Sequence, residues 1–127
     1  MDVNAILYVA DQGRSRDFYA AVLDMKPALD VPGMTEFELN SGCVLGLMPE
    51  KGIKRLLGNK LPDPASAAGT PRAEIYLLVE EPAAYHARAL KAGAKELAPL
   101  KKMDWGHTAA YSLDPDGHVL VFAKKTA

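Results

Sequence analysis

The amino-acid sequence predicts an α+β fold made of two similar modules, whose strands form one curved mixed sheet with the helices on its outer face. Two observations lead to this prediction. Short runs of β-branched, aromatic and aliphatic residues, typical of strands, alternate with two segments whose apolar residues repeat at helical spacing. The two halves of the chain also align with each other, so one strand–helix–strand–strand unit occurs twice.

The first module is expected over residues 4–48. Its strands are predicted at residues 4–9, 34–39 and 43–48. A helix should begin near Ser15, whose hydroxyl can accept hydrogen bonds from free backbone N–H groups, and Pro27 should end it. Phe18 and Tyr19 belong to the apolar face of this helix, which we expect to pack on the sheet.

Residues 49–72 are rich in Gly and Pro and are expected to form an internal linker, with one helical turn at residues 53–57. This segment is also the most basic part of the chain. Two interpretations stay open. The segment is either a solvated connector or a lid that supplies positive charge to a bound anion.

The second module is expected over residues 73–123. Its strands are predicted at residues 74–79, 96–100, 108–113 and 118–123. A helix should begin at Pro82, a residue suited to the first helical turn, and stop at Gly93. The sequence Asp114-Pro-Asp-Gly117 has the composition of a tight turn between the last two strands.

The repeat is clearest at the strands that open and close each module. Residues 4–11 match residues 74–81, and residues 42–47 match residues 117–122. Neither module is large enough to cover a core alone, so we expect a single domain over residues 1–127. The concave inner face of its sheet would form a ligand pocket.

Composition and charge exclude several classes of function. A chain of 127 residues with a net charge of −1 has no positive field for nucleic acid and no polybasic patch for a membrane surface. Its first residues lack the basic start and apolar run of a signal peptide. The single cysteine, Cys43, can form no internal disulfide and is expected in the core, so we expect a cytoplasmic protein.

One local pattern points to a known family. Trp105-Gly106 precedes a strand that leads to Asp114-Pro-Asp-Gly117 and His118. With the repeat, this pattern resembles the vicinal-oxygen-chelate superfamily of glyoxalases, bleomycin-resistance proteins and dioxygenases, and in particular the bleomycin-resistance-like branch. The resemblance covers about residues 4–123. It implies two βαβββ modules, and it implies a homodimer.

Enzymes of this superfamily hold one divalent metal with four side chains from the first and last strands of each module. The matching positions here are Asn4, Gly46, Glu74 and Val121. Only Glu74 is a good ligand, because an amide oxygen is a weak donor and the other two positions offer no donor atom. We therefore expect no metal and no other cofactor.

Strand alternation predicts the side chains that face the pocket. Candidate ligand-binding residues are Tyr8, Glu74, Tyr76, Trp105, His107 and Tyr111. Aromatic walls of this kind suit a flat organic molecule, although the same side chains could simply fill a core. Of the other histidines, His86 is expected to face solvent and His118 to pack or to cap a turn.

The sequence thus predicts a metal-free protein that binds a small organic ligand, for example an antibiotic-like one, in the concave cavity. Two alternatives remain. A divergent lyase or isomerase could use Glu74 as a base, since partial desolvation on an apolar wall would raise the pKa of its carboxyl group. An interaction module would bind no small ligand at all.

Overall fold

The computed structural model describes residues 1–127 and confirms the α+β fold class. The first module contains β1 (Val3–Val9), α1 (Gln12–Leu23), β2 (Leu29–Val31), β3 (Met34–Asn40) and β4 (Cys43–Pro49). The second module contains β5 (Glu74–Leu78), α3 (Pro82–Lys91), β6 (Lys95–Lys102), β7 (His107–Leu113) and β8 (Val119–Lys125). Both modules therefore have the order βαβββ.

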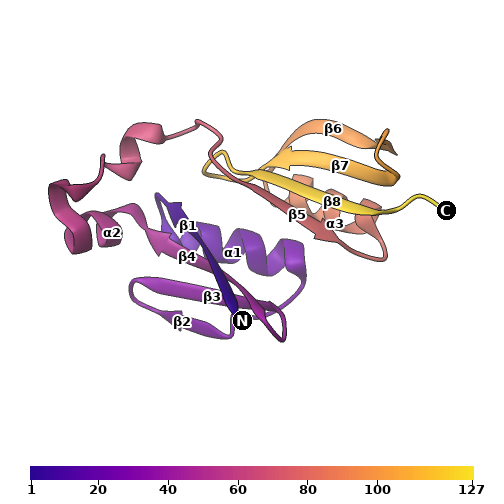
Figure 1. Ribbon diagram of the computed structural model, residues 1–127. Coiled ribbons are helices and arrows are strands. Elements are labelled where there is room, and N and C mark those ends of the chain that lie inside the picture. Colours follow the sequence, from indigo (N-terminus) through magenta and orange to yellow (C-terminus); the bar gives the residue numbers. More distant parts are fainter. The chain divides into compact units, whose positions relative to one another are not determined.

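Each module forms its own four-stranded sheet, so the expected single sheet is two sheets in the structure (Figure 1). The strand orders are β1-β4-β3-β2 and β5-β8-β7-β6. In both, the first strand runs parallel to the last, and the remaining pairs are antiparallel. The chain divides into two compact units, residues 1–20 with 24–68 and residues 21–23 with 69–127.

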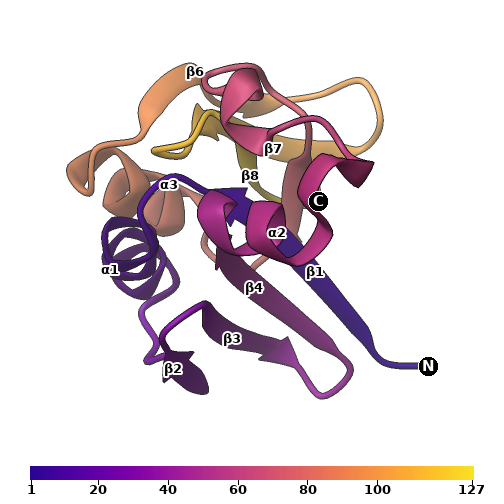
Figure 2. The same cartoon turned by 90° about the vertical axis from the view of Figure 1, so that its left-hand side faces the viewer.

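The first sheet buries one face and exposes part of the other. In β1, Leu7 and Val9 are buried, whereas Asn4 and Ile6 on the opposite face are exposed. The helix α1, which is seen nearly end-on beside the strands of this module in Figure 2, buries Phe18 and Tyr19, among others. The alternating direction of side chains along a strand therefore assigns Leu7 and Val9 to the buried face correctly.

Helix α1 begins earlier than the sequence predicts. Asp11 is the N-cap residue, and its carboxylate accepts a hydrogen bond of 3.0 Å from the backbone N–H of Arg14. Ser15 lies inside the first turn with its side chain buried, so its predicted role as a cap is wrong. The helix ends at Leu23, before Pro27, because Asp24 adopts a left-handed conformation with φ 53°.

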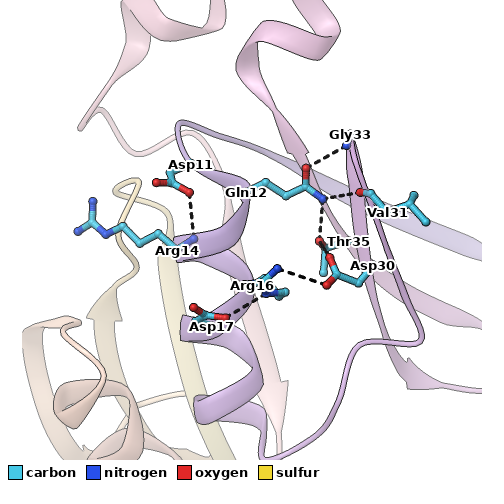
Figure 3. Close-up of polar contacts among 9 residues, drawn as sticks. All are labelled: Asp11, Gln12, Arg14, Arg16, Asp17, Asp30, Val31, Gly33 and Thr35. Carbon is cyan, nitrogen blue, oxygen red and sulfur yellow. Dashed lines mark hydrogen bonds and ion pairs between the residues drawn. The ribbon is translucent and has the colours of Figure 1, made fainter.

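The side chain of Gln12 fastens the start of α1 to the hairpin of β2 and β3 (Figure 3). Its amide nitrogen donates to the carbonyl oxygen of Val31 at 2.8 Å and to the hydroxyl of Thr35 at 2.9 Å. Its amide oxygen accepts from the backbone N–H of Gly33 at 3.0 Å. The Thr35 hydroxyl in turn donates to Asp30 at 2.9 Å, so this corner forms a connected polar network.

The segment after β4 has more structure than the expected linker. Residues 50–57 form the helix α2 (Glu50–Leu57), and two short 3₁₀ turns follow at Gly58–Lys60 and Pro64–Ala67. Ile53 is the buried residue of α2. Lys54 bonds Asp63 at 2.7 Å, and this hydrogen bond, with one from the backbone N–H of Ala65, lowers the pKa of the Asp63 carboxyl. No helix in the structure is both long and apolar enough to cross a membrane.

In the second module, α3 packs on β7 and β8. The Tyr85 ring lies 5.2 Å from the Phe122 ring, measured between centroids, and the Arg88 guanidinium lies 4.3 Å above the Tyr85 ring. His86 is buried rather than solvent-facing, and its Nε2 lies 2.9 Å from the Glu96 carboxylate of β6. The expectation for His86 was wrong because this helix meets β6 as well as the middle of the sheet.

Strand β6 is the outer strand of the second sheet, and its pairing with β7 is irregular. The register shifts twice, between Glu96 and Ala98 and between Ala98 and Lys101. Pro99 lies within the second of these shifts and has no N–H group to donate. Three lysines stand at the two ends of the strand: Lys95, Lys101 and Lys102.

The tight turn between β7 and β8 forms as predicted. The Asp114 carboxylate accepts from the backbone N–H groups of Asp116 and His118, both at 2.9 Å. Gly117 has φ 87°, and a Cβ at this position would lie 3.1 Å from the Cα of Gly69. This turn therefore needs glycine both for its backbone angle and for a close approach of two backbones.

Candidate functional site

The candidate site is the face of the second sheet that lies opposite α3. Since Phe122 contacts α3, its neighbours in β8 point to the other face. The strand register arranges this face in rows. In order along β5, the rows are Glu74–Val119–Leu113, Tyr76–Val121–Tyr111 and Leu78–Ala123–Ala109. His107 lies one step beyond the last row, opposite Lys125.

Small side chains form the floor of this face. Ala109, Val121 and Ala123 are fully buried and make one apolar cluster. Four partly buried side chains pack against this cluster: Tyr76, Met103, Tyr111 and Val119. Because the alanines occupy the row after Tyr76, its ring can extend across them toward His107.

A chain of hydrogen bonds joins three of the predicted residues. The indole N–H of Trp105 donates to the phenolic oxygen of Tyr76 at 3.0 Å. The same oxygen lies 2.6 Å from Nδ1 of His107, and the two rings are tilted by 36° with their centroids 5.7 Å apart. Trp105 is half exposed, so the chain holds an aromatic surface that solvent can reach.

Besides the Trp105–Tyr76–His107 chain, this face carries two further polar side chains, Tyr111 and Glu74. Burial raises the pKa of the Tyr111 hydroxyl, and the nearby Glu74 carboxylate and Tyr76 add to the shift. Tyr111 is therefore a neutral hydroxyl that can donate a hydrogen bond at physiological pH. Glu74 itself is exposed at the start of β5, so the partial desolvation expected for a base is not found.

The structure thus brings together Tyr76, Trp105 and His107, with Tyr111 in the same row as Tyr76 and Glu74 in the row before it. Tyr8 belongs to β1 of the first module, where it is half-buried, and its role in binding stays a prediction. The sequence reasoning placed Ala123 on this face but missed Met103 and Ala109. Alternation along residues 107–113 could have found Ala109, whereas a methionine in a loop carries no such signal.

The four positions that match the family's metal ligands do not fit a metal. In the first module, Asn4 offers an exposed amide, and a Cβ at Gly46 would lie 3.1 Å from Cγ1 of Ile6 and 3.3 Å from Sδ of Met34. In the second module, Glu74 is a carboxylate but Val121 is a fully buried aliphatic residue. Neither module contains three or more His, Cys, Asp or Glu side chains placed to hold an ion.

Comparison with known proteins identifies the family. The family model described as the Glyoxalase/Bleomycin resistance protein/Dioxygenase superfamily matches residues 3–122, and the chain belongs to this superfamily. An uncharacterized protein of Mycobacterium bovis is 30% identical over 115 residues, covering 88% of this chain and 75% of its own length. An uncharacterized protein of Mycobacterium tuberculosis has the same identity and matches over 67% of its length.

Solved structures agree on the fold. A glyoxalase-related enzyme from Fulvimarina pelagi superposes with a TM-score of 0.82 at 22% identity, covering 98% of this chain and 88% of that one. A glyoxalase/bleomycin resistance protein/dioxygenase family enzyme from Burkholderia phytofirmans gives the same TM-score at 14% identity, with coverage of 99% and 100%. At such identities the likeness concerns the fold alone.

Proposed function

We propose that this protein binds a small, planar organic molecule without a metal, on the face of the second sheet that carries Tyr76, Trp105 and His107. The hydrogen-bonded chain of these three side chains is the observation that carries the proposal. An aromatic surface that is held in place and reaches solvent is suited to stacking against a flat ligand.

The apolar floor and the few polar groups around it support this proposal. Binding sites for small molecules are mostly apolar with a small number of polar groups that set orientation. Here the buried floor of Ala109, Val121 and Ala123 supports four partly buried side chains, which supply the apolar surface: Tyr76, Met103, Tyr111 and Val119. The polar groups are the Tyr111 hydroxyl, Glu74 and His107. Metal-independent binding is proposed because only one of the four ligand positions carries a carboxylate.

Catalysis by Glu74 is not favoured by its surroundings. A carboxylate acts as an efficient base at neutral pH when its environment raises its affinity for a proton. Glu74 is exposed, with water able to solvate its charge. We therefore propose that Glu74 contributes a hydrogen-bond acceptor to the bound ligand rather than a catalytic base.

The test is a panel of planar aromatic compounds, including polycyclic antibiotics, screened by thermal shift and followed by calorimetric titration. A ligand that binds only the folded protein must raise Tm. We expect Trp105→Ala to weaken binding by about tenfold through loss of the stacking surface. Leu56→Ala removes a more exposed apolar side chain from α2 and is the matched control.

If no compound raises Tm, the proposal is wrong and an interaction module becomes the better explanation. Equal weakening by Trp105→Ala and Leu56→Ala would place binding elsewhere in the chain. Tyr8→Ala, titrated with the same ligand, tests whether the first module contributes to binding as the sequence predicts.

We further propose that the protein belongs to the bleomycin-resistance-like branch, sequesters its ligand in the cytoplasm and forms a homodimer. The Trp105-Gly106 and Asp114-Pro-Asp-Gly117 motifs support the branch, and the dimer rests on resemblance to its members. Native mass spectrometry reports subunit number and any carried ligand together. A monomer at micromolar concentration would contradict the dimer.

A further inference from the structure

We infer that Trp105 and Tyr76 hold His107 as the tautomer protonated on Nε2, and that this N–H group selects planar ligands bearing a carbonyl oxygen. The inference rests on the proposed function and names the class of ligand. It follows from the two hydrogen bonds at the Tyr76 oxygen.

The direction of each hydrogen bond can be worked out from the groups involved. An indole nitrogen has a hydrogen and no lone pair to share, so Trp105 donates and the Tyr76 oxygen accepts. The phenol has one proton of its own to donate. Nδ1 of His107, at 2.6 Å, is the acceptor within reach, and no other partner of the Tyr76 oxygen is found in the structure.

The other tautomer of His107, with its proton on Nδ1, leaves the Tyr76 hydroxyl proton without an acceptor. If Nδ1 carried the proton, Tyr76 would accept from both Trp105 and His107, and its own hydroxyl proton would have no acceptor. A partly buried donor without a partner costs free energy, so the structure favours the arrangement in which Tyr76 donates. A neutral imidazole whose Nδ1 accepts must carry its proton on Nε2.

The Nε2 group is left available to a ligand. His107 is half-buried, and its Nε2 has no hydrogen-bond partner, yet it is not among the buried polar atoms that lack one. It therefore reaches solvent. This N–H donor lies beside an indole and the partly buried side chains that cover the apolar floor. Such a surface matches a flat aromatic molecule with an acceptor oxygen in or on its ring system, as in an aromatic ketone or quinone.

The tautomer can be tested without any ligand. In the free protein, nitrogen-15 NMR of the imidazole rings should show Nδ1 of His107 unprotonated and Nε2 protonated. The chain has three histidines, so loss of a signal in His107→Gln assigns it. Tyr76→Phe should shift the Nδ1 signal toward a mixture of tautomers, whereas Tyr85→Phe in α3 should leave it unchanged. A proton on Nδ1 in the wild-type protein would overturn the inference.

Selection of a carbonyl oxygen is tested with paired probes that differ in one group. The pairs are 1-indanone with indane and 9-fluorenone with fluorene, titrated into the full chain. We expect each ketone to bind about fivefold tighter than its hydrocarbon, as one hydrogen bond would provide. His107→Phe should abolish this preference, and His107→Gln, which keeps a donor, should retain part of it.

The outcomes separate this inference from the proposed function. Equal binding of ketone and hydrocarbon would overturn the role of His107 as a donor and leave aromatic binding intact. A ketone preference that survives His107→Phe would also overturn it. If no probe binds although the tautomer is found, the proposed aromatic site is wrong, and the selection inferred from it is wrong as well.

Discussion

The phenolic oxygen of Tyr76 in β5 lies 2.6 Å from Nδ1 of His107 at the start of β7, although 31 positions separate the two residues in the chain. These strands are not neighbours, because β8 lies between them. The Tyr76 side chain therefore ties together two strands that share no backbone hydrogen bond. It does so across the small side chains of Ala109 and Ala123.

Removing this tie should destabilise the second module. Tyr76→Phe eliminates both hydrogen bonds and leaves Nδ1 of His107 and the Trp105 N–H without a partner. We expect the free energy of unfolding to fall by about 1–2 kcal/mol, measured by urea denaturation. Tyr85→Phe is the matched control, with an expected change below about 0.5 kcal/mol. Equal effects of the two variants would contradict the role of Tyr76.

Tyr111 should make stability fall at high pH. Its pKa is raised in the folded state above the ordinary value of 10.0, chiefly by burial. The folded state then holds the Tyr111 proton more tightly than the unfolded state. The resulting contribution to the free energy of unfolding is therefore full below pH 10 and is lost as pH rises through the folded-state pKa. Spectrophotometric titration should show a late-ionising tyrosine that is missing in Tyr111→Phe. If Tyr111→Phe still shows a tyrosine that ionises late, the raised pKa belongs to another tyrosine.

Gly117→Ala should strain the turn between β7 and β8. Its φ of 87° is unfavourable for alanine, and the new Cβ would lie 3.1 Å from the Cα of Gly69. We expect a loss of about 2–3 kcal/mol in the free energy of unfolding. Gly33→Ala, with φ 96° and open space around the new Cβ, measures the backbone cost alone. An equal loss in both variants would show that the approach of Gly69 has no effect.

Gln12→Ala should loosen the outer strand of the first sheet. The substitution removes three hydrogen bonds, to Val31, Thr35 and Gly33. Amide hydrogen exchange over residues 29–36 should become faster by about tenfold, because β2 then keeps only its pairing with β3 and the exposed ion pair of Asp30 with Arg16. Arg14→Ala in the same helical turn should leave exchange unchanged. Unaltered exchange in Gln12→Ala would mean that β3 and the Arg16–Asp30 ion pair hold β2 in place without Gln12.

Removal of metal should have no effect on this protein. Only Glu74 among the four family positions offers a carboxylate, and Gly46 and Val121 offer no donor atom. We expect treatment with EDTA to leave Tm and the affinity for an aromatic ligand unchanged. A fall in Tm that added zinc or manganese reverses would show that a metal site exists.

Much of the fold could be predicted from sequence because its signals are local. Alternation in β1 and the turn residues Asp114 and Gly117 report directly on burial and backbone angle. Strand β2 was missed, since its three residues are all exposed and leave no burial pattern. Its position depends on Gln12, which lies in a different element. Such a contact between distant residues has no periodicity to detect.

In the candidate site, too, local strand patterns could be predicted from the sequence, whereas contacts between distant residues could not. Tyr76 and Tyr111 could be placed on one face by counting along strands. The contact of Trp105 with Tyr76 could not, because Trp105 lies in a loop whose conformation depends on the strands it joins. His86 was misplaced for a related reason, since its partner Glu96 belongs to the strand after the helix.

The irregular outer strand β6 has a consequence for how copies of this chain can meet. A regular strand edge offers a row of free N–H and C=O groups to which another strand can add. Two register shifts, a proline and three lysines interrupt that row in β6. Addition of a strand from another copy of the chain is therefore disfavoured at this edge, so the second sheet is protected there against growth into a fibre.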